Sequence, residues 1–89
     1  MAMTTLKYVA LHGRSPTGLV RYTFAGVDVG TAATLRIVQY DGAPGFYLIH
    51  LDEEGREIAD TYHDTIEDAL EQAELEFAVK PREWLEWTD

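Results

Sequence analysis

The segment from residue 64 to residue 77 constrains the fold more than any other part of the chain. Its apolar side chains recur at the spacing of one helix face, and its charged side chains fall on the opposite face. The apolar positions are Ile66, Ala69, Leu70, Ala73 and Phe77. We therefore predict one amphipathic helix over residues 64–78 whose apolar stripe, with Phe77 buried, packs against a sheet built from the preceding residues.

Both ends of this helix carry recognisable signals. Asp64 followed by Glu67 is typical of a helix N-cap, and Thr65 followed by Asp68 offers a competing frame one residue later. Acidic residues in the first turn also suit the helix dipole. The helix outlined by these signals carries several acids on its outer side, and we expect Glu76 to be among them.

The chain beyond the helix is short and ends in two tryptophans. Lys80 precedes Pro81 and is biased away from helical geometry, so the helix is expected to end near residue 78 or 79. Proline favours the first turn of a helix, so we predict a short helical tail over residues 81–87. We expect Trp84 to lie in the core and Trp87 to be partly exposed.

Before the helix, short apolar or alternating runs bounded by turn residues predict about five strands. These runs cover residues 6–11, 19–24, 35–40, 46–51 and 56–62, with a loop over residues 26–34. The expected fold class is α+β, with a meander-like antiparallel sheet and the C-terminal helix packed on one face. The alternative is two short sheets that form an incomplete barrel, closed by the helix and Trp84.

The last two strands predict a hairpin around residues 52–55, with Gly55 in the left-handed position. In the simplest register His50 faces Ile58, and His50 then shares a face with Asp60. Neither face of this hairpin is cleanly polar, although a half-exposed antiparallel sheet normally alternates. We therefore expect a second cover besides the helix, from the C-terminal tail, a twin subunit or a partner.

Composition limits the classes of function. A chain of 89 residues forms one domain, residues 1–89, and its 46% hydrophobic content is that of a globular protein. Residues 1–44 carry four basic and two acidic side chains, whereas residues 45–89 carry three basic and fourteen acidic ones, giving net charges of +2 and −11. This acidity argues against binding a nucleic-acid backbone and favours a basic partner protein or simple solubility.

Other observations concern the compartment. The chain has no cysteine, which suits a reducing compartment. We expect neither a signal peptide nor a membrane span, because no apolar run approaches the required length. These features are compatible with a cytoplasmic protein, and they predict one that does not bind membranes.

Few residues suggest chemistry. Residues 13–18 have the glycine spacing of a phosphate loop but are followed by Leu19 and Val20 instead of lysine and a hydroxyl residue. His50 with Asp60 is the one candidate for a general base and its orienting carboxylate, without an identified nucleophile. His63 is interpreted as a strand-to-helix junction residue. No catalytic residue, metal ligand or cofactor is therefore assigned.

A docking surface is the preferred hypothesis for a site. Leu75 falls on the polar side of the predicted helix, between Glu71 and Glu74, and tryptophan is enriched at interaction hot spots. We predict that Leu75, Trp87, Glu71 and Glu74 bind a partner.

One stretch of the chain has a wider resemblance. Residues 60–69 (Asp-Thr-Tyr-His-Asp-Thr-Ile-Glu-Asp-Ala), continuing as Gln72-Ala73-Glu74 and Glu76-Phe77 and ending in Glu83-Trp84, make up roughly the last third. This pattern resembles the C-terminal part of a family of small bacterial single-domain proteins that have no assigned activity. The resemblance implies a bacterial, cytoplasmic protein with a sheet followed by one helix, and it transfers no functional residue.

The sequence thus predicts a non-enzymatic, acidic protein-interaction or regulatory domain that binds a basic protein or forms a homodimer. One specific form is an immunity-like or antitoxin-like protein whose acidic surface masks a basic active site. The alternative is a small enzyme or ligand-binding domain that uses the face carrying His50 and Asp60.

Overall fold

The computed structural model describes residues 3–12, 23–24, 27–28 and 32–87. The elements in chain order are β1 (Met3–Ala10), β2 (Thr23–Phe24), β3 (Val27–Asp28), β4 (Thr34–Tyr40), β5 (Phe46–Leu51), β6 (Glu57–His63), α1 (Ile66–Phe77), the 3₁₀ helix η2 (Pro81–Glu83) and β7 (Leu85–Glu86). Within these residues no helix is long and apolar enough to cross a membrane.

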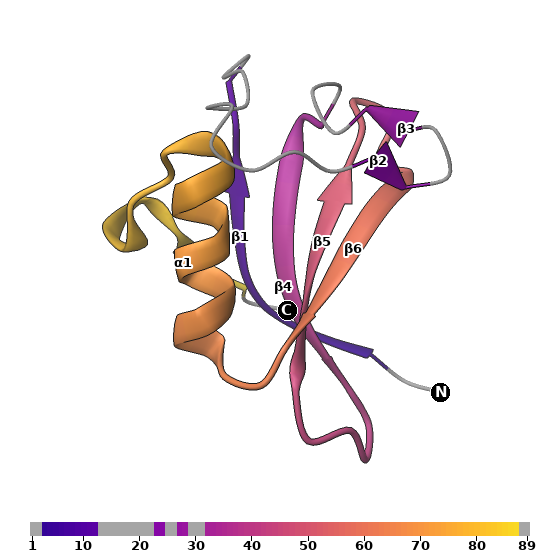
Figure 1. The fold of residues 1–89 in the computed structure, drawn as a ribbon, viewed down its shortest axis with the longest axis vertical. Coiled ribbons are helices and arrows are strands. Elements are labelled where there is room, and N and C mark those ends of the chain that lie inside the picture. The colour runs from indigo at the N-terminus through magenta and orange to yellow at the C-terminus, as the bar shows by residue number, and fades with distance from the viewer. Residues whose placement is uncertain (1–2, 13–22, 25–26, 29–31, 88–89) are drawn as a thin grey trace.

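The main sheet has five antiparallel strands in the order β6-β5-β4-β1-β7. Strands β4, β5 and β6 form a meander, β1 pairs with β4, and β7 closes the far edge, while β2 and β3 pair separately. Figure 1 shows α1 on one side of this sheet, with the C-terminal segment passing around α1 to reach β1. The predicted α+β fold is confirmed.

The helix α1 covers one face of the sheet, which we name the helix-side face. Ala69, Ala73 and Phe77 are buried there, and Ile66 and Leu70 pack partly buried against the same cluster, so the predicted apolar stripe is confirmed. The sheet contributes Val9, Leu35, Ile37, Leu48 and Ala59 to this cluster. Burial of these side chains is the main force that holds α1 on the sheet.

The opposite face, which we name the outer face, carries its own apolar cluster. Val38, Ile49 and Leu51 are buried in it, and Tyr40 and Tyr47 pack against them. Because side chains alternate along a strand, residues 36, 38 and 40 of β4 point to the outer face while 35 and 37 point toward α1. Both faces of the sheet therefore carry apolar side chains, and the second cover expected besides the helix stays a prediction.

The helix begins one residue later than the first of the two sequence frames. Thr65 is the N-cap, and its hydroxyl accepts a hydrogen bond from the Asp68 backbone N–H at 3.1 Å. The competing frame is therefore correct and Asp64 is not the cap. At the other end Ala78 adopts a left-handed conformation with φ of 58°, and its N–H donates to the Glu74 carbonyl.

The segment after α1 differs from the predicted helical tail. Only residues 81–83 form a helical turn, and Leu85–Glu86 instead form the edge strand β7 beside β1. The Trp87 N–H also donates to the Leu6 carbonyl at 3.1 Å, which continues this pairing. The free edge of β1 presents unpaired backbone N–H and C=O groups, and this segment pairs with them as a strand. Trp84 lies in the core, as predicted.

The hairpin of β5 and β6 has the predicted turn and a different register. Gly55 has φ of 80°, and the Asp52 carboxylate accepts hydrogen bonds from the backbone N–H groups of Glu54 and Arg56. The N–H of Arg56 is the main cause that lowers the pKa of Asp52. The turn therefore holds a charged Asp52.

The predicted opposition of His50 and Ile58 is wrong. His50 pairs with Ala59 and Leu51 pairs with Glu57, so Ile58 is an extra residue in a β-bulge. Beyond the bulge every side chain of β6 changes face relative to the prediction. Asp60 consequently pairs with Ile49 on the outer face, and His50 lies on the helix-side face.

The remaining predictions in the first half are only partly within the described residues. Thr23–Phe24 is a strand as predicted, but it pairs with Val27–Asp28, where a loop was predicted, in a separate two-stranded sheet. The fifth strand of the main sheet is β7 instead. The glycine-spaced turn over residues 13–18 and the predicted strand residues 19–22 lie outside the described residues.

Candidate functional site

The outer face collects the exposed apolar side chains of the described residues. Five large hydrophobic residues are exposed there or elsewhere in this part of the chain: Met3, Tyr62, Leu75, Leu85 and Trp87. All but Leu75 belong to the outer face. Residues that are directly opposed on neighbouring strands point to the same face, and Met3 pairs with Tyr40, Leu85 with Tyr8 and Tyr62 with Tyr47. Among the described residues, the outer face therefore carries most of the large apolar side chains that are open to water.

Trp87 defines one end of the outer face. Its ring meets the Tyr8 ring edge-to-face at 5.4 Å, and the guanidinium carbon of Arg36 lies 4.8 Å from its centroid. Tyr8 and Arg36 are directly opposed on β1 and β4, which places the indole over this pair. Trp87 remains 37% exposed, as predicted, so a partner can contact it without rearrangement of the strands.

Three tyrosines define the other end. Tyr47 meets Tyr40 at 5.2 Å and Tyr62 at 5.3 Å, both edge-to-face. A side chain at Gly45 would overlap the Tyr62 ring, so only glycine leaves room for that ring across the hairpin. Such aromatic pairs add stability beyond the area that they bury and hold the rings in fixed orientations.

Two carboxylates lie beside the tyrosines because of the bulge in β6. Without the bulge Glu57 and Asp60 would point to opposite faces, but with it both reach the outer face. Burial raises the pKa of Glu57, and so do the hydrogen bond and the negative charge of Asp60. The pKa of Tyr40 is also raised, by burial and then by the charges of Glu57 and Asp60. This end of the outer face is therefore negative and favours an approaching cation.

The residues predicted to bind a partner do not form one surface. Leu75 is exposed on α1 near Glu71, and Glu74 of the same helix pairs with Lys80 at 2.7 Å. Trp87, by contrast, stacks on the outer face, with the sheet between it and α1. The structure therefore separates Trp87 from the three predicted helix residues.

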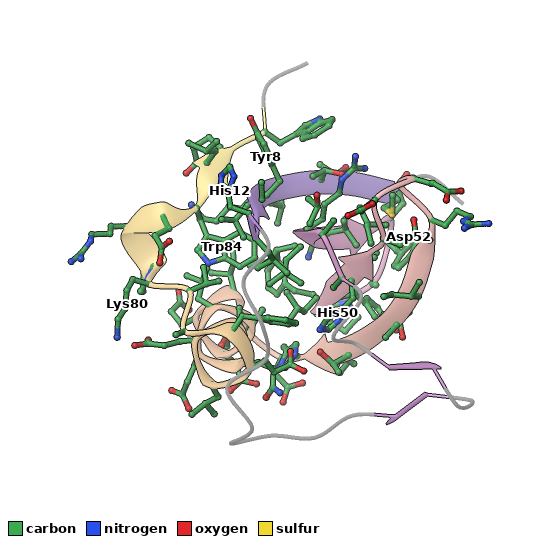
Figure 2. The ribbon with its side chains drawn as sticks, turned by 90° about the horizontal axis from the view of Figure 1, so that it is seen from above. Tyr8, His12, His50, Asp52, Lys80 and Trp84 are labelled. Atoms are coloured by element: carbon green, nitrogen blue, oxygen red, sulfur yellow. The ribbon has the colours of Figure 1, made fainter. Side chains whose placement is uncertain are left out.

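His50 is buried in the core on the helix-side face, so it does not share a face with Asp60. Its Nε2 lies 3.0 Å from Oε1 of Glu76, and both side chains are only 1% exposed. Figure 2 shows His50 inside the molecule, between α1 and the curved sheet. The prediction that Glu76 lies on the acidic outer side of α1 is wrong, and so is the shared face of His50 and Asp60. The buried pair also leaves Nδ1 of His50 and Oε2 of Glu76 without a hydrogen-bond partner among the residues that the structure describes.

His63 is more than a junction residue. Its Nδ1 lies 3.0 Å from Oδ2 of Asp68, and its Nε2 lies 2.7 Å from the Thr61 hydroxyl oxygen. Thr61 and His63 share the helix-side face because they are two residues apart on β6, and Asp68 lies in the first turn of α1. Strand alternation places Thr61 and His63 on one face, and the helix frame that starts at Thr65 places Asp68 in the first turn, so both signals for this cluster are present in the sequence.

Within the described residues no group of three or more His, Cys, Asp or Glu side chains could hold a metal ion. Comparison of the chain with known protein families, with characterised proteins and with solved structures finds no match.

Proposed function

We propose that this protein is an interaction domain that binds a basic protein through the outer face of its sheet. The observation that carries the proposal is the placement of exposed apolar side chains. Four of the five in the described residues belong to that face, and they include Trp87 and Tyr62. Tryptophan, tyrosine and arginine are the residues most enriched at binding hot spots, and Arg36 lies beside Trp87.

The charge of the chain favours a basic partner over a second copy. The formal net charge is −9, so two copies would bring two strongly negative molecules together. The carboxylates of Glu57 and Asp60 flank the tyrosine end of the outer face, where a lysine or arginine side chain would remove their mutual repulsion. Complementary charge of this kind raises the association rate and restricts the choice of partner.

A domain that masks a basic active site is the specific form that we favour. An immunity-like or antitoxin-like protein needs a rigid acidic surface with an apolar centre, and the outer face combines the two. The resemblance of residues 60–84 to small bacterial proteins supports a bacterial, cytoplasmic setting for this role.

The test starts with the mass of the purified protein in solution by light scattering. We expect a monomer, and a stable dimer that disappears in Trp87→Ala would replace the basic partner with a second copy. Captured proteins are then identified with the wild type as bait, and each is purified and tested for direct binding.

The binding experiment compares two exposed apolar residues on different surfaces. Loss of a hot-spot side chain costs about 2 kcal/mol or more, so Trp87→Ala should weaken binding about thirtyfold. Leu75→Ala is the matched control on α1 and should leave the affinity unchanged. A stronger loss of affinity in Leu75→Ala than in Trp87→Ala would assign the interface to the helix. Equal affinity of the wild type, Trp87→Ala and Leu75→Ala would show that neither surface binds the partner.

A further inference from the structure

Thr61, His63 and Asp68 form a chain of hydrogen bonds that the interaction role does not use. We propose that the Thr61 hydroxyl is a nucleophile, that His63 is its general base, and that Asp68 positions the imidazole. The chemical class of substrate is an activated acyl donor, such as an aryl ester.

The distances carry this proposal. A hydroxyl nucleophile and its base must lie within hydrogen-bond reach, with the base oriented by a third group. The Thr61 oxygen lies 2.7 Å from Nε2 of His63, and Nδ1 of the same ring lies 3.0 Å from the Asp68 carboxylate. Hydroxyl, imidazole and carboxylate thus occur in the order, and on the ring nitrogens, that a nucleophilic triad requires.

The fold fixes each of the three groups. Thr61 and His63 project from one face of β6, which pairs with β5 over most of its length. Asp68 is held in the first turn of α1, where its backbone N–H donates to the Thr65 hydroxyl. The base and its positioning residue therefore come from two elements that the core packs together, and neither depends on a loop.

The hydrogen-bond partners of His63 determine which ring nitrogen carries the hydrogen. A carboxylate only accepts hydrogen bonds, so Nδ1 of His63 carries a hydrogen and donates it to Asp68. Nε2 of the neutral imidazole is then free to accept the hydrogen of the Thr61 hydroxyl. This tautomer is the one that a general base needs.

The transfer of the acyl group to Thr61 requires no reactant other than the aryl ester. The Thr61 oxygen attacks the carbonyl carbon of the aryl ester while its proton moves to Nε2 of His63. The bond to the aryl oxygen then breaks, and the proton passes from His63 to the departing aryloxide. The products are O-acyl Thr61 and a phenol. Attack by water on the acyl carbon then breaks its bond to the Thr61 oxygen, which releases the carboxylic acid and restores the hydroxyl.

Access to the site suits a small donor. The His63 side chain is only 8% exposed, whereas Asp68 is 59% exposed and Thr61 is half-buried. In the part of the chain that the structure describes, β6 is an edge strand of the sheet, so a small planar ester can approach Thr61 from that edge. An activated ester is the appropriate substrate because its aryloxide is a good leaving group.

The test uses p-nitrophenyl acetate, with the acetylated residue located by peptide mass spectrometry. General base catalysis contributes about 10²–10⁴-fold, so we expect Thr61 to be acetylated at least about a hundredfold faster than the exposed Thr4 of β1. Thr61→Val keeps the β-branched shape and should abolish the modification, whereas Thr61→Ser should retain it. Thr4→Val is the matched control and should change nothing at residue 61.

Two further variants separate catalysis from a structural role. His63→Gln should reduce the acetylation rate of Thr61 to that of an ordinary hydroxyl, and Asp68→Asn should reduce it less. Circular dichroism confirms that each variant is folded. Acetylation confined to lysines or to His63 in the wild type would overturn the proposal, as would an unchanged Thr61 rate in folded His63→Gln. Neither result bears on the outer face, so the interaction proposal is judged separately.

Discussion

Two histidine–carboxylate pairs join α1 to the sheet, and their surroundings are opposite. The side chains of His50 and Glu76 are both 1% exposed, and within the described part of the chain each has a polar atom without a hydrogen-bond partner. His63 is also nearly buried, but its partner Asp68 is 59% exposed and both ring nitrogens of His63 are hydrogen-bonded. The same two chemical groups thus appear once enclosed and incompletely bonded, and once open to water and fully bonded.

The comparison shows what burial does to such a pair. Burying charged or polar groups costs free energy that only good geometry and complete hydrogen bonding recover. The enclosed pair therefore restricts the position of α1 over β5, since a small shift of the helix would break the hydrogen bond and leave both polar groups unpaired in the core. The open pair does not restrict the helix in this way, because water can replace either partner.

The largest expected effect comes from breaking the enclosed pair. Glu76→Ala leaves His50 buried without its partner, and removal of one member of a buried pair costs about 3–5 kcal/mol. Unfolding in urea, followed by circular dichroism, measures the loss. Glu74→Ala is the matched control on the same helix, because its ion pair with Lys80 is partly exposed and should contribute less than about 1 kcal/mol. Equal losses in the two variants would show that burial does not distinguish them.

Replacing both members of the enclosed pair should have a smaller effect of opposite sign. The double variant His50→Leu with Glu76→Met fills a similar volume and removes every unsatisfied polar atom of the pair. Apolar replacements of buried pairs are often neutral or stabilising by about 1–4 kcal/mol. The same urea experiment applies, and a double variant as unstable as Glu76→Ala would show that the pair itself stabilises the fold.

The open pair should contribute least of the two. Asp68→Asn keeps a side chain that can accept from His63 Nδ1 and removes the negative charge, so the expected loss is about 1 kcal/mol or less. Thermal unfolding near neutral pH measures it. A loss of stability as large as that of Glu76→Ala would contradict the claim that the exposed pair contributes less, because the exposure of Asp68 would then have no effect on stability.

The sequence predicted the parts of the fold that depend on local patterns. The apolar stripe from Ile66 to Phe77, the left-handed Gly55 and the buried Trp84 follow from helix periodicity, turn chemistry and side-chain size. Glu76 was misplaced because a charged residue beside the stripe is normally solvated, and only its tertiary partner His50 makes burial tolerable. Residues 85–86 became a strand because β1 offered a free edge, which no local pattern reports.

The bulge in β6 had the widest consequences for the candidate site. One extra residue at Ile58 moved Asp60 to the outer face and left His50 on the helix side. A bulge depends on how two strands twist around each other, so alternation within one strand does not reveal it. The contact between the acids Glu57 and Asp60 could therefore not be predicted from the sequence, and neither could the tyrosine cluster beside it.

The smallest expected effect tests an acid whose neighbour is another acid instead of an imidazole. The raised pKa of Glu57 means that its contribution to stability is present at low pH and is lost as the pH rises through that pKa. Glu57→Gln should therefore raise the melting temperature slightly near neutral pH, and the gain should vanish below about pH 4, where the wild-type carboxyl is also neutral. Glu53→Gln, in the exposed turn of the same hairpin, is the matched control and should have no such pH-dependent gain. A melting temperature that falls in Glu57→Gln near neutral pH would mean that a cation already satisfies this carboxylate, and the outer face would then lose its reason to prefer a basic partner.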